Sequence, residues 1–196
     1  MLSELGATLV DVEFAGLEDV IPIGETIVGS EMTAYHQQWY VARPHEYPDA
    51  MRKRFEQSRR LSAIELLNAE RARERIRAEF WTALQRVDVL VTPTTPMTAI
   101  RIGRSTVDFD GRAQAFDDQV VRFTYPFNLT GWPALSIPCG LDRGGLPIGL
   151  QLAGRPWQEA LLFRVGHAYQ QSTEWHRRRP SLGRAADQVL CVARGS

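Results

Sequence analysis

Residues 123–154 constrain the fold of this chain more than any other stretch of the sequence. They are rich in glycine and proline, yet short apolar runs of strand length separate the turn residues. Residues 134–138 and 148–152 are predicted as strands, and Pro138, which cannot donate a ladder hydrogen bond, is expected to end the first. The glycines between the two runs supply turn geometry. Upstream, residues 126–133 are predicted to form a constrained loop, because two prolines fix its backbone.

Apolar residues recur at helical or strand spacing through most of the remaining chain. Val28, Met32, Tyr35 and Trp39 share one helical face, and the stripe along residues 62–87 is the longest. Residues 100–118 lack such periodicity and are expected to be an irregular surface excursion. Helices interleaved with strands predict an α/β layered domain. Helices are expected near residues 28–39, 48–60, 62–87 and 157–172, and further strands at residues 8–14 and 88–92.

The totals exclude several classes of protein. The chain has 196 residues with 44% hydrophobic and 23% charged residues, as expected of a globular domain. Its formal net charge of zero provides no general attraction to nucleic acid or to an anionic membrane. We expect neither a signal peptide nor a membrane span, because no sufficiently long apolar run is present. Cys139 and Cys191 lie far apart, so a disulfide framework is not expected and a cytoplasmic location is.

Several ordered segments together resemble a known family. PFNLTGWPALSIPCG followed by GLPIGLQLAGRPW is similar to the C-terminal part of the amidase signature family. VDVLVTPTTP at residues 87–96, the helix at 159–169 and the tail at 175–180 extend the resemblance. It covers residues 1–182, and residues 183–196 are expected to be a flexible tail. The resemblance implies an α/β fold with a mixed β-sheet flanked by helices, of which this chain supplies the C-terminal portion.

The resemblance also implies a chemistry that this chain cannot perform by itself. The family hydrolyses amides, or transfers ammonia from them, with a Ser–cis-Ser–Lys triad. Here no two serines are adjacent, and the only lysine, Lys53, lies on a charged helix face. A serine without a nearby base is a weak nucleophile. We therefore expect no catalytic residue in this chain, which is interpreted as the C-terminal part of an amidase, inactive without the triad. The alternative is a non-catalytic, truncated or split-gene product that binds a partner.

Other catalytic arrangements are weaker. Cys139 with His167 or His176 is a conceivable Cys–His pair, but we favour Cys139 as a small packing residue at a strand end. The four histidines have no metal-ligand spacing, so no metal and no cofactor are expected. The basic runs at residues 52–54, 59–60 and 177–179 are interpreted as solvated faces, without nucleic-acid binding.

The best candidates for substrate contact lie in the constrained loop. Thr124, Asn128, Thr130 and Trp132 combine hydrogen-bonding groups with an aromatic ring. An equally weighted alternative is that the polar side chains satisfy backbone groups of the loop. The tRNA-dependent amidotransferase branch of the family has an acidic residue where this chain has residues 121–123, which favours a general amidase. The expected partners are the N-terminal amidase half, or a second copy through self-association, and a small amide substrate once the domain is complete.

Overall fold

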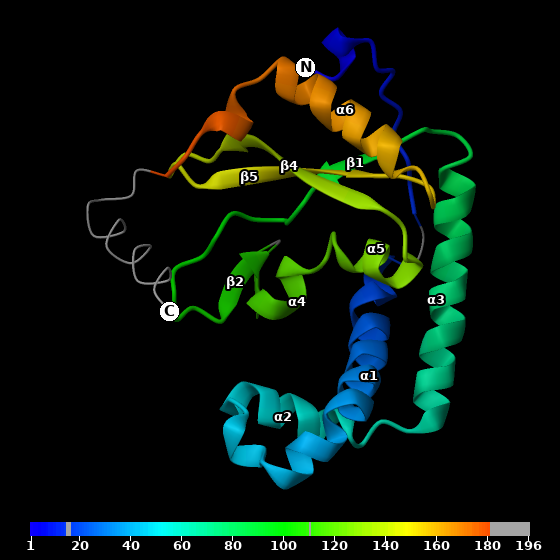
Figure 1. Cartoon of the computed structure of the whole chain (residues 1–196), viewed down its shortest axis with the longest axis vertical. Coiled ribbons are helices and arrows are strands. Elements are labelled where there is room, and N and C mark those ends of the chain that lie inside the picture. Colours follow the sequence, from blue (N-terminus) through cyan, green and yellow to red (C-terminus); the bar gives the residue numbers. More distant parts are fainter. Residues whose placement is uncertain (15–16, 110, 181–196) are drawn as a thin grey trace, which may run out of the picture.

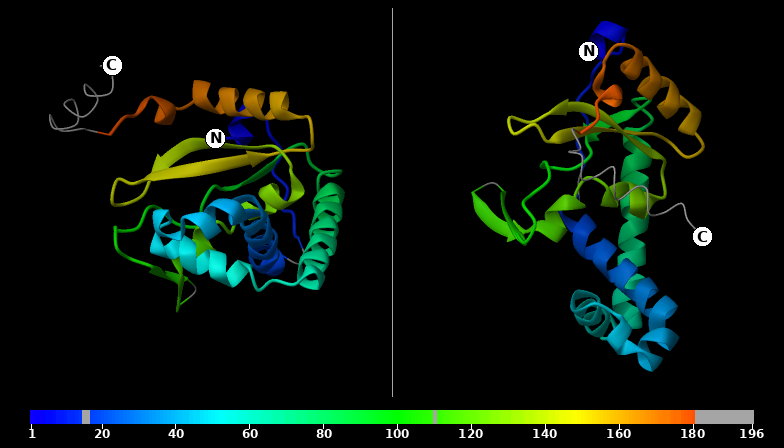
Figure 2. Two further views of the ribbon diagram at one scale, coloured as in Figure 1. Left: turned by 60° about the horizontal axis from the view of Figure 1, so that its bottom comes forward. Right: turned by 60° about the vertical axis from the view of Figure 1, so that its left-hand side comes forward.

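The computed structural model describes residues 1–14, 17–109 and 111–180. One half of the molecule contains a three-stranded sheet with a helix on its outer face. The other half contains two long helices that extend away from the sheet (Figures 1 and 2). The flexible tail expected at residues 183–196 lies outside the described residues.

The helices follow the sequence pattern where it is long and regular. The stripe at residues 62–87 forms α3, and a capping box in which Ser62 and Glu65 satisfy each other's backbone N–H groups fixes its start. Tyr125–Thr130 forms α5, which ends at Gly131 in the left-handed region with φ of 71°. The helices are α1 (Val20–Ala42), α2 (Asp49–Ser58), α3 (Ala63–Ala83), α4 (Phe116–Val120), α5 (Tyr125–Thr130) and α6 (Glu159–Gln171).

The main sheet is antiparallel with the strand order β1-β5-β4. The predicted strands at 134–138 and 148–152 are confirmed as neighbours, although β4 continues past Pro138 through an irregularity between Pro138 and Gly140. The strand expected at 88–92 starts later, at Leu90. The strands are β1 (Leu90–Pro93), β2 (Thr106–Phe109), β3 (Arg112–Ala115), β4 (Ala134–Leu141) and β5 (Pro147–Ala153), and β2 pairs with β3 in a separate two-stranded sheet.

Two apolar clusters lie on the two faces of the main sheet. Leu162 and Tyr169 of α6 pack with Ile137 and Leu152 on the outer face. On the other face the larger cluster joins α1, α3 and α5, and the Phe80 ring lies edge-on to the Phe127 ring with centroids 5.7 Å apart. This second cluster places α5 between the sheet and the long helices.

Two segments expected to be irregular are ordered. The stretch 126–133 contains α5, because Pro126 lies in the first helical turn, where a missing N–H costs nothing. Residues 100–118 contain the β2–β3 hairpin and the start of α4.

Three further expectations were wrong. Residues 8–14 form no strand, since their backbone finds no partner strand among the described residues. The predicted stripe on α1 faces outward, with Tyr35 70% and Trp39 45% exposed, while Gly24 and Ile27 face the core. The last helix begins at Glu159, because Trp157 has a positive φ of 66° and cannot continue a right-handed helix.

Candidate functional site

The start of α5 is tied to the sheet by one buried side chain. Gln151 on β5 is 3% exposed, and its Nε2 donates to the Phe123 carbonyl at 2.9 Å and to the Thr92 Oγ1 at 3.0 Å. A buried amide with satisfied hydrogen bonds fixes the groups that it contacts. Gln151 therefore holds the residue that immediately precedes Thr124 against β5.

A second tie joins α5 to the helical half. The Tyr125 hydroxyl donates to Glu25 Oε1 at 2.6 Å, and Arg54 donates to the other Glu25 oxygen at 2.7 Å. Burial and the hydrogen bond to Glu25 raise the pKa of the Tyr125 phenol. Gly24 makes this approach possible, because a Cβ there would lie 2.8 Å from the Tyr125 ring. The chain thus fixes α5 from both sides.

The four sequence-predicted substrate residues occupy different environments on and around α5. The Thr124 and Thr130 hydroxyls donate to the carbonyls of Val121 and Phe127, at 3.1 Å and 3.3 Å. Asn128 is exposed and makes no side-chain hydrogen bond to any described residue. Both threonine hydroxyls have the local backbone partners that the alternative interpretation expects, whereas Asn128 is available to a ligand.

Thr130 and Trp132 also line a cleft of about 270 Å³ at the C-terminal end of α5. Trp132 is 7% exposed, and its ring lies edge-on to those of Phe80 and Trp81. Arg77 and Glu159 bring one charge of each sign to the same cleft. The remaining lining residues are Gly131, Pro133, Pro156 and Trp157. The structure therefore brings two of the four predicted residues together, while Thr124 and Asn128 lie outside this lining.

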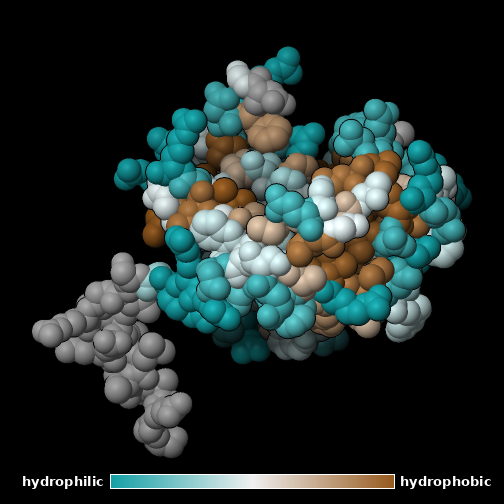
Figure 3. Space-filling model, turned by 90° about the horizontal axis from the view of Figure 1, so that it is seen from above, coloured by the Kyte–Doolittle hydropathy of each residue, from teal (hydrophilic) through white to brown (hydrophobic). Residues whose placement is uncertain are grey.

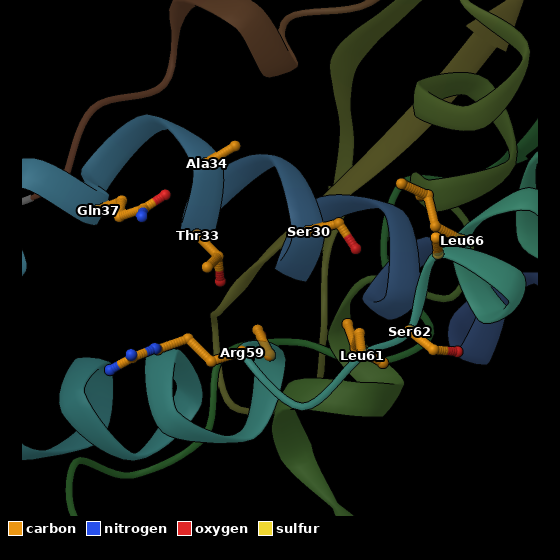
Figure 4. Close-up of a pocket in the computed structure, with 10 residues that line it drawn as sticks. Ser30, Thr33, Ala34, Gln37, Arg59, Leu61, Ser62 and Leu66 are labelled. Atoms are coloured by element: carbon orange, nitrogen blue, oxygen red, sulfur yellow. The ribbon is translucent and has the colours of Figure 1, made fainter.

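A second cleft of about 260 Å³ lies between α1 and the α2–α3 connection (Figure 4). Thr33 points from α1 toward Arg59, and Ser30 and Ser62 lie nearby. The Ser30 hydroxyl donates to the Thr26 carbonyl, and the Ser62 hydroxyl caps α3, so both are engaged within their own helices. None of the sequence-predicted substrate residues lines this cleft, and the region around α5 is the stronger candidate site.

The sequence reasoning missed a row of polar side chains on the sheet face that looks toward α5. Thr92, Gln151 and Ser136 lie opposite one another across β1, β5 and β4. The hydroxyls of Ser136 and Thr94 lie 2.6 Å apart over Gly149, where a Cβ would approach Thr94 Oγ1 to 2.6 Å. Polar residues at every second position of residues 92–94 were the available signal.

The other catalytic candidates stay apart. The Cys139 thiol donates weakly to the Ile148 carbonyl at 3.5 Å, and burial raises its pKa. Lys53 and His167 are exposed, on α2 and α6 respectively. Within residues 1–14, 17–109 and 111–180, no group of three potential ligands for a metal ion occurs. In the same part of the chain no helix is long and apolar enough to cross a membrane.

Comparison with known proteins agrees with this geometry. Residues 1–163 match the family model described as Amidase. An amidase of Pseudomonas putida is 37% identical over 182 residues, which cover 92% of this chain and 39% of that protein. One component of the glutamyl-tRNA(Gln) amidotransferase of Microcystis aeruginosa is 49% identical over 116 residues, covering 59% of this chain and 23% of that protein. A crystal structure of an amidase matches with a TM-score of 0.82 at 25% identity, over 87% of this chain and 39% of that chain.

These matches have two consequences. The α/β fold and the resemblance drawn from the sequence are confirmed. The chain spans 39% of the length of the Pseudomonas putida relative, so it corresponds to a part of the amidase domain. This chain belongs to the amidase family.

Proposed function

We propose that this chain provides one wall of an amidase substrate site, used to hydrolyse an amide C–N bond once the remaining part of the domain is present. The observation that carries the proposal is the match to the amidase family over residues 1–163, with only 39% of the Pseudomonas putida amidase covered. The wall is α5 with its flanking residues, which the chain holds from both sides through Gln151 and Glu25.

The residues of this chain do not provide the nucleophile in this proposal. Lys53 is the only lysine, it is exposed on α2, and no two serines are adjacent in the sequence. A serine nucleophile needs a base within hydrogen-bond reach. The Ser–cis-Ser–Lys triad is therefore assigned to polypeptide outside residues 1–196.

The substrate-facing groups that we propose are Thr124, Asn128, Thr130 and Trp132. The Asn128 amide can donate to a substrate carbonyl and accept from a substrate N–H, which matches the groups of an amide bond. Trp132 and Thr130 offer an aromatic and a polar surface in the cleft beside it. A small amide is favoured over a tRNA-linked one, because residues 121–123 lack an acidic side chain.

The test compares the chain alone with the chain joined to, or co-expressed with, an amidase segment that carries the triad. We expect no hydrolysis of simple amides by the chain alone, and hydrolysis by the completed protein. In the completed protein, Asn128→Ala should lower kcat/KM about tenfold, the equivalent of one lost hydrogen bond of about 1.4 kcal/mol. Gln38→Ala, at an exposed polar position on α1, is the matched control. Turnover by the purified chain alone that survives Lys53→Ala and Cys139→Ala would contradict the proposal.

The second candidate is a non-catalytic protein that binds a partner or a second copy of itself. Large exposed apolar side chains favour it, including Trp157, which is 91% exposed, and Tyr35, which is 70% exposed. Sedimentation at low concentration, with a fluorescent probe for apolar surface, tests this candidate. A monodisperse monomer that unfolds cooperatively and binds no probe would eliminate it. For either candidate we propose a reducing, cytoplasmic location, since Cys139 is a free thiol.

A further inference from the structure

The segment of residues 8–14 has the sequence of a strand without a place in a sheet. Its letters, TLVDVEF, put Val10, Val12 and Phe14 on one side and Asp11 and Glu13 on the other, which is the alternation of a half-buried strand. It belongs to neither sheet of the structure. Among the described residues, its backbone groups make no hydrogen bond to other backbone groups. Figure 1 shows it as a drawn-out stretch between the N-terminal turn and α1.

One end of this segment is anchored to the core. The Phe14 ring stacks on the Phe80 ring with centroids 4.3 Å apart and an interplanar angle of 26°, and Val12 packs against the same cluster. At the other end, Leu9 is 64% and Val10 52% exposed. A backbone held in place before it meets a partner loses less conformational freedom on binding. The chain therefore presents residues 8–14 as a preorganised strand.

The surroundings of the free end are also apolar. The N-terminal segment and α6 lie together at the top of the molecule in Figure 1, and the face seen from that side carries broad hydrophobic areas (Figure 3). Phe163 on α6 is 63% exposed, in addition to Leu9 and Val10. An unpaired strand with exposed apolar neighbours is a template for pairing with another strand.

We infer that residues 8–14 form a β-strand by pairing with an extended segment of the amidase domain that lies outside residues 1–196. This inference rests on the proposed function, because it takes the partner to be the part of the domain that the Pseudomonas putida relative contains and this chain does not. The partner strand places neutral or basic side chains opposite Asp11 and Glu13, and apolar ones beside Leu9 and Val10.

A second copy of the chain is a poorer partner for this strand. An antiparallel pair of two such strands centred on Asp11 puts the two Asp11 carboxylates opposite each other, as does a parallel pair in register. Like charges directly opposite each other destabilise a strand pair. The acidic positions of the segment thus favour a different strand over self-pairing.

The test measures backbone amide hydrogen exchange in residues 9–13, in the chain alone and in the protein completed with the triad-bearing segment. In the chain alone these amides should exchange at nearly the rate of an unstructured peptide. In the completed protein we expect exchange to slow by ~100-fold or more, as for amides in a stable sheet. Amide hydrolysis is assayed on the same samples.

Val10→Pro and Val10→Thr form the matched pair of variants. Proline removes a ladder donor and fixes φ, whereas threonine keeps the N–H and suits a strand. We expect Val10→Pro to abolish the protection of residues 9–13 and to weaken association with the completing segment at least tenfold, and Val10→Thr to retain both. Unprotected amides in an active completed protein would overturn this inference and leave the proposed function intact. Protected amides in an inactive protein would support the strand and count against the proposed function.

Discussion

The hydrogen bonds of Gln151 offer a direct test of how α5 is positioned. Gln151→Leu keeps a similar side-chain volume, so the cavity contribution is small, but it removes the donor to both the Phe123 carbonyl and the Thr92 hydroxyl. Each bond contributes about 0.5–1.5 kcal/mol, and an acceptor left without a donor in the interior costs about 1–3 kcal/mol. We expect the free energy of unfolding to fall by about 2–4 kcal/mol.

Urea denaturation of the chain measures this loss. With a slope of about 2 kcal/mol/M for a domain of this size, the midpoint should fall by roughly 1–2 M. Ser136→Ala is the matched control, since Ser136 lies directly opposite Gln151 on β4 but its bond to Thr94 is exposed. The control should cost less than about 1 kcal/mol, because water replaces an exposed partner.

A local readout separates positioning from general destabilisation. Amide exchange in residues 125–131 should accelerate in Gln151→Leu at urea concentrations where the chain remains folded, while exchange in α6 should not change. Equal midpoints for Gln151→Leu and Ser136→Ala, with unchanged exchange in α5, would refute the tie between β5 and α5.

Three further outcomes are expected. Gly24→Ala should destabilise the chain by about 1–3 kcal/mol, because the new methyl group meets the Tyr125 ring, whereas Gly140→Ala has open space and should change stability by less than about 0.5 kcal/mol in the same urea assay. Alkylation of Cys139 should be slow at pH 7 and accelerate only as the pH rises through its raised pKa, and rapid alkylation at pH 7 would contradict a packing role. Because burial and the bond to Glu25 raise the pKa of Tyr125, its stabilisation is complete below the unfolded pKa of about 10 and is lost as the pH rises through the folded pKa, so Tyr125→Phe should flatten the fall in melting temperature above pH 10.

The sequence predicted the elements whose pattern is long or bounded by clear turn residues. The stripe of α3 and the β4–β5 pair belong to this group. The short helix α5 carried a signal that the prediction did not use, namely proline in the first turn and glycine just after the last. The Asp-Gly dipeptide at residues 110–111 was likewise an available signal for the β2–β3 hairpin.

The remaining errors depend on contacts between distant parts of the chain. The α1 stripe was assigned to the core because it is apolar, but the face with Gly24 and Gly29 packs more closely, against Tyr125 and Ser58. No helical periodicity encodes that choice. The candidate site has the same property, since Gln151 contacts a carbonyl 28 residues away in sequence and a hydroxyl 59 residues away. Local patterns indicated which polar residues lie near α5, and only the fold shows what holds them.

The two ways in which this chain holds its segments suggest an order of assembly for the site. Within the residues that the structure describes, α5 is fixed to β5 through Gln151 and to α1 through Glu25. Its geometry is therefore set by the chain itself, before any completing segment binds. Residues 8–14 differ, since their side chains are anchored at Phe14 while their backbone makes no ladder. Completion of the domain should consequently order the backbone of residues 8–14 and leave α5 where it is, because pairing adds hydrogen bonds only where donors and acceptors are still unmatched.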